Sequence, residues 1–160
     1  MRLTTYTDYS LRVLIRLALN PEELTTIADI ARAYNISQHH LMKVVHHLGL
    51  AGYIETVRGH GGGMRLAKKP AQIPLGEVVR RTEPDFGLVD CFRASECCAI
   101  QPACLLTGVL QEALDAFLAV LDRYTLADLV GKPRMLASLL KIPAAPSAAD
   151  KPGRTRTAQD

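Results

Sequence analysis

Residues 52–70, GYIETVRGHGGGMRLAKKP, decide the fold. Residues 53–57 and 64–67 predict two short strands, and a cluster of glycines separates them. A glycine cluster also occurs in phosphate-binding loops, but here no Gly-Lys-Ser/Thr follows, and a strand comes next instead of a helix. The stretch therefore predicts a β-hairpin with a glycine tip and basic residues along it, namely Arg58, His60, Arg65, Lys68 and Lys69.

Three segments before the hairpin have apolar residues at helical spacing. The first, residues 5–19, ends at Asn20-Pro21, and the second begins after Thr25 or Thr26. The third follows Ser37, which can cap it, and is joined to the second by the three-residue turn 34–36. Two short helices joined in this way, with a hairpin after them, favour a winged helix-turn-helix over an ordinary αα-hairpin. We expect residues 1–72 to form this DNA-binding domain.

The third helix is expected to enter the major groove of double-stranded DNA with its N-terminal residues first. Gln38 suits adenine, Lys43 suits guanine or a phosphate, and His46 and His47, one turn further along, are expected to be solvated. Residues 1–70 contain nine Lys/Arg and five Asp/Glu, whereas residues 71–140 contain six and nine. The basic first half suggests a polyanionic partner, but a merely solvated surface can have the same uneven charge. The helix-and-hairpin pattern favours the polyanion. The predicted DNA contacts are Ser37, Gln38, His39, His40, Lys43, Arg58, His60 and Arg65.

The second half, residues 73–142, has one long periodic segment at 102–126. Its apolar residues recur at intervals of 4-3-4-3-4, at Leu106, Leu110, Ala113, Phe117, Val120 and Tyr124. Two helices can share such a seam, and helix-turn-helix proteins commonly bind palindromes as two-fold dimers, so we expect a homodimer through this helix. A core helix within one chain is the alternative, which the wider stripe of Leu114, Leu118 and Leu121 supports. The predicted fold class is mainly α, with residues 143–160 as a Pro/Ala-rich disordered tail.

All four cysteines lie within fourteen positions, at Cys91, Cys97, Cys98 and Cys104. The chain has no signal peptide and no apolar run long enough to span a membrane, so we expect a cytoplasmic protein with reduced thiols. That expectation weakens a disulfide clasp. A structural zinc site is disfavoured because Cys-x-x-Cys pairs and nearby histidines are absent.

Two further chemistries remain for the cysteine loop, residues 88–104. A catalytic thiol lacks a histidine or lysine in the loop, and with no nucleophile–base pair elsewhere we expect no enzyme. A reversible disulfide remains open, but an iron–sulfur cluster is favoured because it tolerates irregular spacing. Cys104 follows Pro102 and is expected in the first turn of the long helix, where the helix dipole stabilises a thiolate.

Four motifs together carry a resemblance to a known family. TDYSLRVLIRLAL (7–19), GHGGG (59–63), CCAIQPACLL (97–106) and YTLADL (124–129) resemble the Rrf-type iron–sulfur repressors, over residues 1 to about 140. The resemblance implies three cysteine ligands. Its Cys-x-Ile-x-Pro-x-Cys pattern matches Cys98 and Cys104, and Cys91 becomes the first ligand. Because the first loop is one residue longer than usual, Cys97 in place of Cys98 stays open.

The fourth ligand separates the branches of this family. Cluster-biogenesis members have a histidine three residues after the last cysteine, where this chain has Thr107. Nitric-oxide-sensing members use an aspartate at the start of the first helix of the other subunit, which matches Asp8. Without the resemblance, Asp8 is simply a first-turn carboxylate that stabilises the helix dipole.

The resemblance implies a repressor that binds operator DNA with its cluster and releases the DNA when nitric oxide nitrosylates the cluster. Three cysteines and a carboxylate suit a [4Fe-4S] cluster better than a [2Fe-2S] cluster, although the same ligands serve both. The alternative is a regulator of the same fold that responds to iron supply, to oxidation or through a thiol switch.

Overall fold

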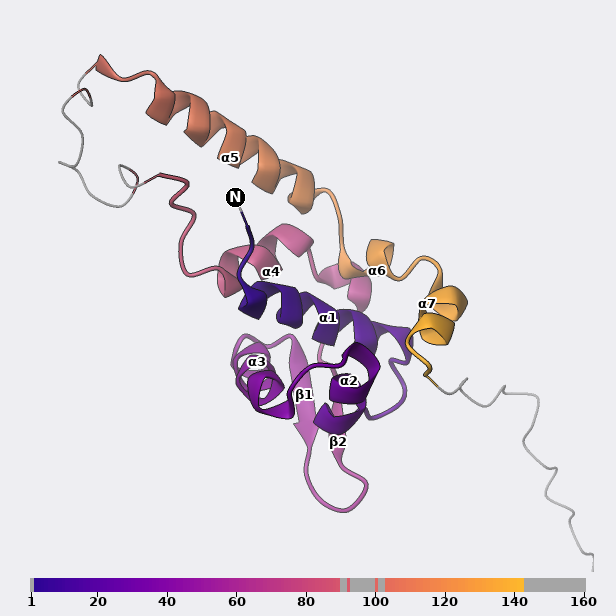
Figure 1. The fold of residues 1–160 in the computed structure, drawn as a ribbon. Helices are drawn as coiled ribbons and strands as arrows, with labels where there is room; N and C mark the ends of the chain where they lie inside the picture. The colour runs from indigo at the N-terminus through magenta and orange to yellow at the C-terminus, as the bar shows by residue number, and fades with distance from the viewer. Residues whose placement is uncertain (1, 90–91, 93–99, 101–102, 143–160) are drawn as a thin grey trace, which may run out of the picture.

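The computed structural model describes residues 2–89, 92, 100 and 103–142. Three helices are followed by a two-stranded hairpin and then by further helices (Figure 1). Their bounds are α1 Thr5–Leu19, α2 Ile27–Tyr34, α3 Gln38–Leu50, β1 Ile54–Val57, β2 Gly63–Leu66, the 3-10 turn η1 Pro70–Gln72, α4 Leu75–Thr82, α5 Leu106–Asp122, α6 Leu126–Leu129 and α7 Pro133–Leu139. The mainly α winged helix-turn-helix predicted from the sequence is confirmed.

Side-chain caps and one left-handed residue set the first helix boundaries. The Thr4 hydroxyl accepts a hydrogen bond from the backbone of Thr7 and caps α1. Thr26 and Asp29 form a reciprocal capping box at the start of α2. Asn35 then takes the left-handed conformation, with φ 53° and ψ 48°, and turns the chain into α3. These local signals produce the predicted helix-turn-helix.

We expect Thr26→Ala to lower the free energy of unfolding by about 1 kcal/mol near neutral pH, because the α2 cap is lost. The Thr26 hydrogen bonds hold the pKa of Asp29 below its ordinary value. A lowered carboxyl pKa stabilises the fold above the unfolded pKa, and this contribution disappears as the pH falls below about 4. Urea unfolding of both proteins at pH 7 and pH 3 measures the difference, which should shrink in acid. A difference that is unchanged at pH 3 would contradict the role of ionised Asp29.

The hairpin is the wing of the fold. Strands β1 and β2 pair antiparallel, with Ile54 opposite Leu66 and Val57 opposite Gly63. At the tip, a Cβ on Gly62 would lie 2.3 Å from the Val57 carbonyl oxygen, so no larger residue fits this turn. An isolated bridge between Thr25 and Met64 joins β2 to the chain before α2. This bridge fixes β2 close to the tip, and the hairpin reaches away from the core (Figure 1).

One hydrophobic core connects both halves of the chain. Helix α1 contributes Val13, Leu14 and Leu17, and it contacts α3, α4 and α6. From the second half, Ile73, Val78 and Leu126 are fully buried in the same cluster. Backbone hydrogen bonds from Leu126 to Ile73 and from Leu75 to Tyr124 join these segments. The DNA-binding helices therefore pack on the segments that flank the cysteine loop.

Helix α5 differs from the predicted helix over residues 102–126. It begins at Leu106, and before it the backbone amide of Ala103 donates a hydrogen bond to the carbonyl of Ile100. It ends at Asp122, since Thr125 caps the separate helix α6. The prediction that Cys104 sits in the first helical turn is wrong, because Cys104 lies two residues before α5.

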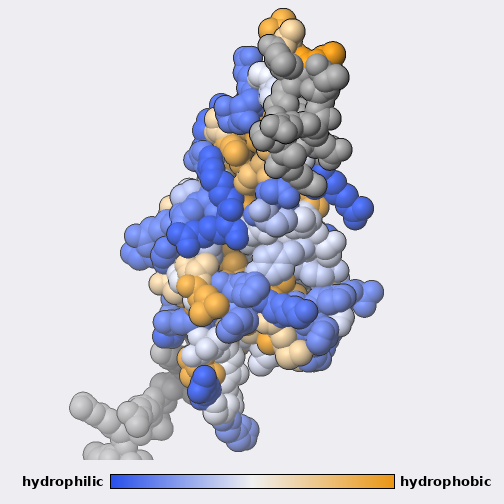
Figure 2. Space-filling model, turned by 90° about the vertical axis from the view of Figure 1, so that its left-hand side faces the viewer, coloured by the Kyte–Doolittle hydropathy of each residue, from blue (hydrophilic) through white to orange (hydrophobic). Residues whose placement is uncertain are grey.

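The N-terminal half of α5 projects away from the core (Figure 1). Leu114 is the buried residue of this helix, which contacts α4. The side chains of Arg80 on α4 and Asp122 on α5 join by two hydrogen bonds of 2.6 Å. At the projecting end, hydrophobic residues gather on the surface, with Leu106 57% and Val109 60% exposed (Figure 2). Within the described residues, no helix has both the length and the apolar character needed to cross a membrane.

Candidate functional site

The predicted DNA contacts come from two elements, the start of α3 and the wing. All eight side chains are solvent-exposed, and they are Ser37, Gln38, His39, His40, Lys43, Arg58, His60 and Arg65. Ser37 occupies the cap position of α3 but makes no capping hydrogen bond, which corrects the expected cap. In the wing, Arg65 of β2 forms an ion pair with Glu55 of β1. Because Glu55 neutralises Arg65, Arg58 and His60 at the tip are the better placed wing residues for a phosphate.

Two histidines of α3 contact α1, which sequence reasoning missed. The Nδ1 atom of His47 lies 3.0 Å from the hydroxyl oxygen of Tyr6, within hydrogen-bond distance, and the two rings meet edge to face. The centre of the His40 ring lies 6.4 Å from the centre of the Tyr9 ring. Tyr6 and Tyr9 are in the first two turns of α1, on either side of Asp8 in the sequence. The part of α1 that carries Asp8 therefore contacts α3 at two places, His40 and His47.

We expect Gln38→Ala and Lys43→Ala to weaken operator binding in different ways. Gln38→Ala should cost about 1–3 kcal/mol at one base position and relax specificity there. Lys43→Ala, if it contacts a phosphate, should weaken binding to every sequence and reduce the salt dependence by about one counterion. Fluorescence anisotropy with operator and scrambled DNA at several salt concentrations separates the two effects. Equal binding by wild type and both variants would remove α3 from the interface.

Of the predicted cluster ligands, Asp8 and Cys104 lie in the described residues. Asp8 is in the first turn of α1, and its Oδ2 accepts a hydrogen bond of 2.9 Å from Nε of Arg12. Both side chains are half exposed, at 47% and 42%. Cys104 is partly buried and has no disulfide partner among the residues that the structure describes. Cys91, Cys97 and Cys98 are outside the described residues.

The donor chemistry of this set fits an iron–sulfur cluster. Thiolates are soft ligands that such clusters require, and a carboxylate can complete the set. Among the described residues, no group of three or more His, Cys, Asp or Glu side chains could hold a metal ion.

The segment that leads into the cysteine loop is hydrogen-bonded to the start of α1. Oε1 of Glu83, the residue that follows α4, accepts hydrogen bonds from the backbone nitrogen of Thr4 at 2.8 Å and from its hydroxyl at 3.1 Å. Thr4 is also the cap of α1. One residue thus connects the segment that leads into the loop with the helix that carries Asp8.

The family of the chain follows from comparison with known proteins. Residues 3–132 match the Rrf2 family, described as "Iron-dependent Transcriptional regulator". The chain belongs to this family of transcriptional regulators, and it is not an enzyme. Membership implies DNA binding and, by the description of the family, dependence on iron.

Individual relatives narrow the comparison. The chain is 57% identical over 144 residues to the HTH-type transcriptional regulator NsrR of Bacillus subtilis, covering 89% of this chain and 99% of the relative. Among solved structures, IscR of T. potens has a TM-score of 0.67 at 25% identity, with 82% and 87% of the two chains covered. CymR, the global cysteine regulator of B. subtilis, has a TM-score of 0.65 at 30% identity, with 82% and 97% covered. Regulators with different names share this fold, so the signal to which this chain responds must be argued from the site.

Proposed function

We propose that the chain is a nitric-oxide-responsive repressor that binds operator DNA as a homodimer. Its iron–sulfur cluster is held by Cys91, Cys98 and Cys104 of one subunit and by Asp8 of the partner subunit. The observation that carries the proposal is the position of Asp8. It is half exposed, on the part of α1 that contacts α3, the helix expected to enter the major groove. The identity to NsrR over nearly the whole relative supports it.

The ligand set explains why a small molecule can act as the signal. When bound, a cluster with three thiolates and one carboxylate offers nitric oxide an iron whose oxygen ligand is harder and more easily displaced than sulfur. We take the cluster to be [4Fe-4S], although a [2Fe-2S] cluster could use the same four ligands. The cysteine loop is the part of the chain that supplies the thiolates, and Cys97 is left as a spare thiol.

Asp8 has a second partner when it is not a ligand. In the single chain its carboxylate pairs with Arg12, whose guanidinium lies 5.7 Å from the ring centre of Tyr34 at the end of α2. Tyr6 and Tyr9 contact α3 on either side. A change in the partners of Asp8 therefore acts on a helix turn that touches both helices of the helix-turn-helix.

Such a contact is sufficient to change DNA affinity in a dimer. The two recognition helices of a two-fold dimer must lie about one DNA turn (~34 Å) apart to bind both half-sites. A small rotation of each DNA-binding unit changes this spacing, and interface rotations of this kind are common in regulated oligomers. Release of Asp8 from the cluster would free α1 from the opposite subunit, and the distance between the two recognition helices could then change.

The apolar surface of α5 supports the homodimer. Leu106, Val109 and Val120 of α5 are between 43% and 60% exposed, and Tyr124, two residues after the helix, is 48% exposed. Leu114, on another side of the helix, is buried, so one face packs within the chain and a second one is left open. Exposed apolar surface at regular helical spacing is typical of a helix that pairs with a copy of itself.

The experiment compares Asp8→Ala with Arg12→Ala, which removes the same ion pair but keeps the carboxylate. We expect Asp8→Ala protein to lose iron quickly and to show no graded release of operator DNA by nitric oxide. Arg12→Ala should keep the cluster and the response. Absorbance of anaerobic protein and DNA anisotropy during a nitric oxide titration measure both properties. If Asp8→Ala keeps wild-type cluster stability and response, Asp8 is not a ligand.

The description of the family as iron-dependent favours a second candidate, a repressor that responds to iron supply. It would use the same cysteines and the same fold. In that case, chelation of iron would release the operator, while nitric oxide at equal occupancy would leave DNA binding unchanged.

A further inference from the structure

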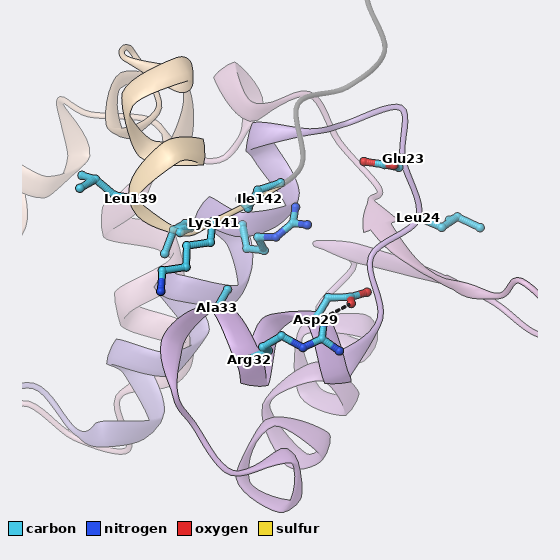
Figure 3. Close-up of a pocket in the computed structure, with 10 residues that line it drawn as sticks. Glu23, Leu24, Asp29, Arg32, Ala33, Leu139, Lys141 and Ile142 are labelled. Atoms are coloured by element: carbon cyan, nitrogen blue, oxygen red, sulfur yellow. Dashed lines mark hydrogen bonds and ion pairs between the residues drawn. The ribbon is translucent and has the colours of Figure 1, made fainter.

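A cavity of about 380 Å³ lies between α1, α2 and the end of α7, apart from the cysteines and from the DNA-binding face. Figure 3 shows Asp29 and Arg32 of α2 on one side of it, with Leu139, Lys141 and Ile142 approaching from α7 and the residues after it. Its size is within the range of small-molecule sites in proteins.

Arg16 of α1 lines this cavity, and two of its guanidinium nitrogens have no hydrogen-bond partner among the described residues. The residue is only 6% exposed, and the two atoms, Nε and Nη1, are buried. A guanidinium stays protonated in proteins and has five N–H donors, so leaving it unpaired inside the fold is costly. Buried polar groups in native structures almost always have a partner, and an unpaired one indicates a missing ligand or ion.

The neighbouring carboxylates do not supply that partner. Oδ2 of Asp29 accepts hydrogen bonds from Thr26, and Oδ1 pairs with Arg32. Oε2 of Glu23 accepts a hydrogen bond from the side chain of Asn20. Burial lowers the pKa of Arg16, and the charges of Asp29 and Glu23 only oppose this effect from a distance.

The end of α7 does not supply it either. The backbone amides of Lys141 and Ile142 donate to the carbonyls of Ser138 and Ala137, so the helix caps its own last turn. Arg16 is therefore not required as a cap for α7.

The charges and the lining define what would fit. Arg16, Arg32 and Lys141 give three positive charges, and Glu23 and Asp29 give two negative ones, which leaves a net charge of +1. A ligand with one negative charge neutralises this set. A dianion would leave a net charge of −1 and would be repelled by the two carboxylates. Leu24, Ala33, Leu139, Leu140 and Ile142 complete the wall with apolar surface.

We propose that this cavity is a binding site for a small monocarboxylate with a short apolar body, whose carboxylate pairs with Arg16. The bound molecule would join α7 to α2, the first helix of the helix-turn-helix, and so act as an effector that stiffens the DNA-binding unit. The site uses none of the cluster ligands, and its test does not depend on the nitric oxide response.

Titration of the full-length, ¹⁵N-labelled protein with sodium butyrate tests the proposal by NMR. We expect saturable shifts of the amides of Ala33, Leu140 and Ile142, with no such shifts from butanol, butylamine or sodium chloride. Disodium succinate should bind more weakly than butyrate. Saturation by sodium chloride at the same concentrations would mean that the cavity takes any anion, which would overturn the monocarboxylate assignment.

Variants then assign the binding to the cavity. Arg16→Met should reduce butyrate affinity about tenfold to a hundredfold, because a charged hydrogen bond is lost. Arg134→Met removes an exposed arginine of α7 that does not line the cavity, and it should bind like wild type. If Arg16→Met fails to fold, Lys141→Gln, at an exposed position, should still weaken binding. No saturable shift in wild type, or equal affinity in wild type and the cavity variants, would overturn the proposal.

Discussion

Replacing Cys104 by serine should abolish iron binding and reduce operator affinity to the non-specific level, about a thousandfold or more. Cys104 lies two residues before α5, so its loss would remove a proposed ligand next to the start of this helix. Serine keeps the size of the side chain but is a poor ligand for iron at neutral pH. Iron and sulfide assays on anaerobic protein, with operator binding by anisotropy, measure the effect.

Cys97→Ser is the matched control for this variant, because Cys97 is adjacent to the proposed ligand Cys98 in the same loop. It should keep wild-type iron content and operator affinity, while Cys98→Ser should behave like Cys104→Ser. The opposite result for the two neighbours would move the second ligand to Cys97. Full iron content in Cys104→Ser would remove the three-cysteine site altogether.

The second large effect is expected at the exposed face of α5. Val109→Lys should convert the homodimer into monomers, because a charge placed in an apolar interface costs several kcal/mol unless it is paired. A monomer contacts one half-site only, so affinity for a palindromic operator should fall with it. Sedimentation velocity measures the association state, and anisotropy measures the affinity.

Gln111→Lys is the control for this variant, since it adds the same charge at an exposed position two residues along α5 and about 200° around the helix. It should remain dimeric. A dimer in both variants would place the interface elsewhere, and a monomeric wild type would contradict the dimer itself.

Local sequence was sufficient for much of the fold. The wing follows from glycines at a turn that leaves no space for a side chain, and the helix-turn-helix follows from Thr26 as a cap and Asn35 as a left-handed residue. The start of α5 could not be predicted from Pro102 alone. A proline can begin a helix, but here the helix begins only at Leu106.

Contacts between distant residues were beyond the sequence. His47 is exposed, as expected, but nothing in its own helix shows that Tyr6, 41 positions earlier, lies beside it. Arg16 gave no sign of burial, since arginines on an amphipathic helix are usually on the solvated face. The cluster ligands were assigned from the family resemblance, and Cys104 and Asp8 are the two that the structure describes.

The most direct test of the central claim is a nitric oxide titration of anaerobically purified protein in which absorbance and operator binding are recorded on the same sample. We predict a brown protein that contains iron and sulfide, whose visible absorbance bleaches with nitric oxide while the operator is released in parallel. A colourless protein without iron and sulfide that binds the operator fully, or a bleached protein that still binds it, would contradict the account.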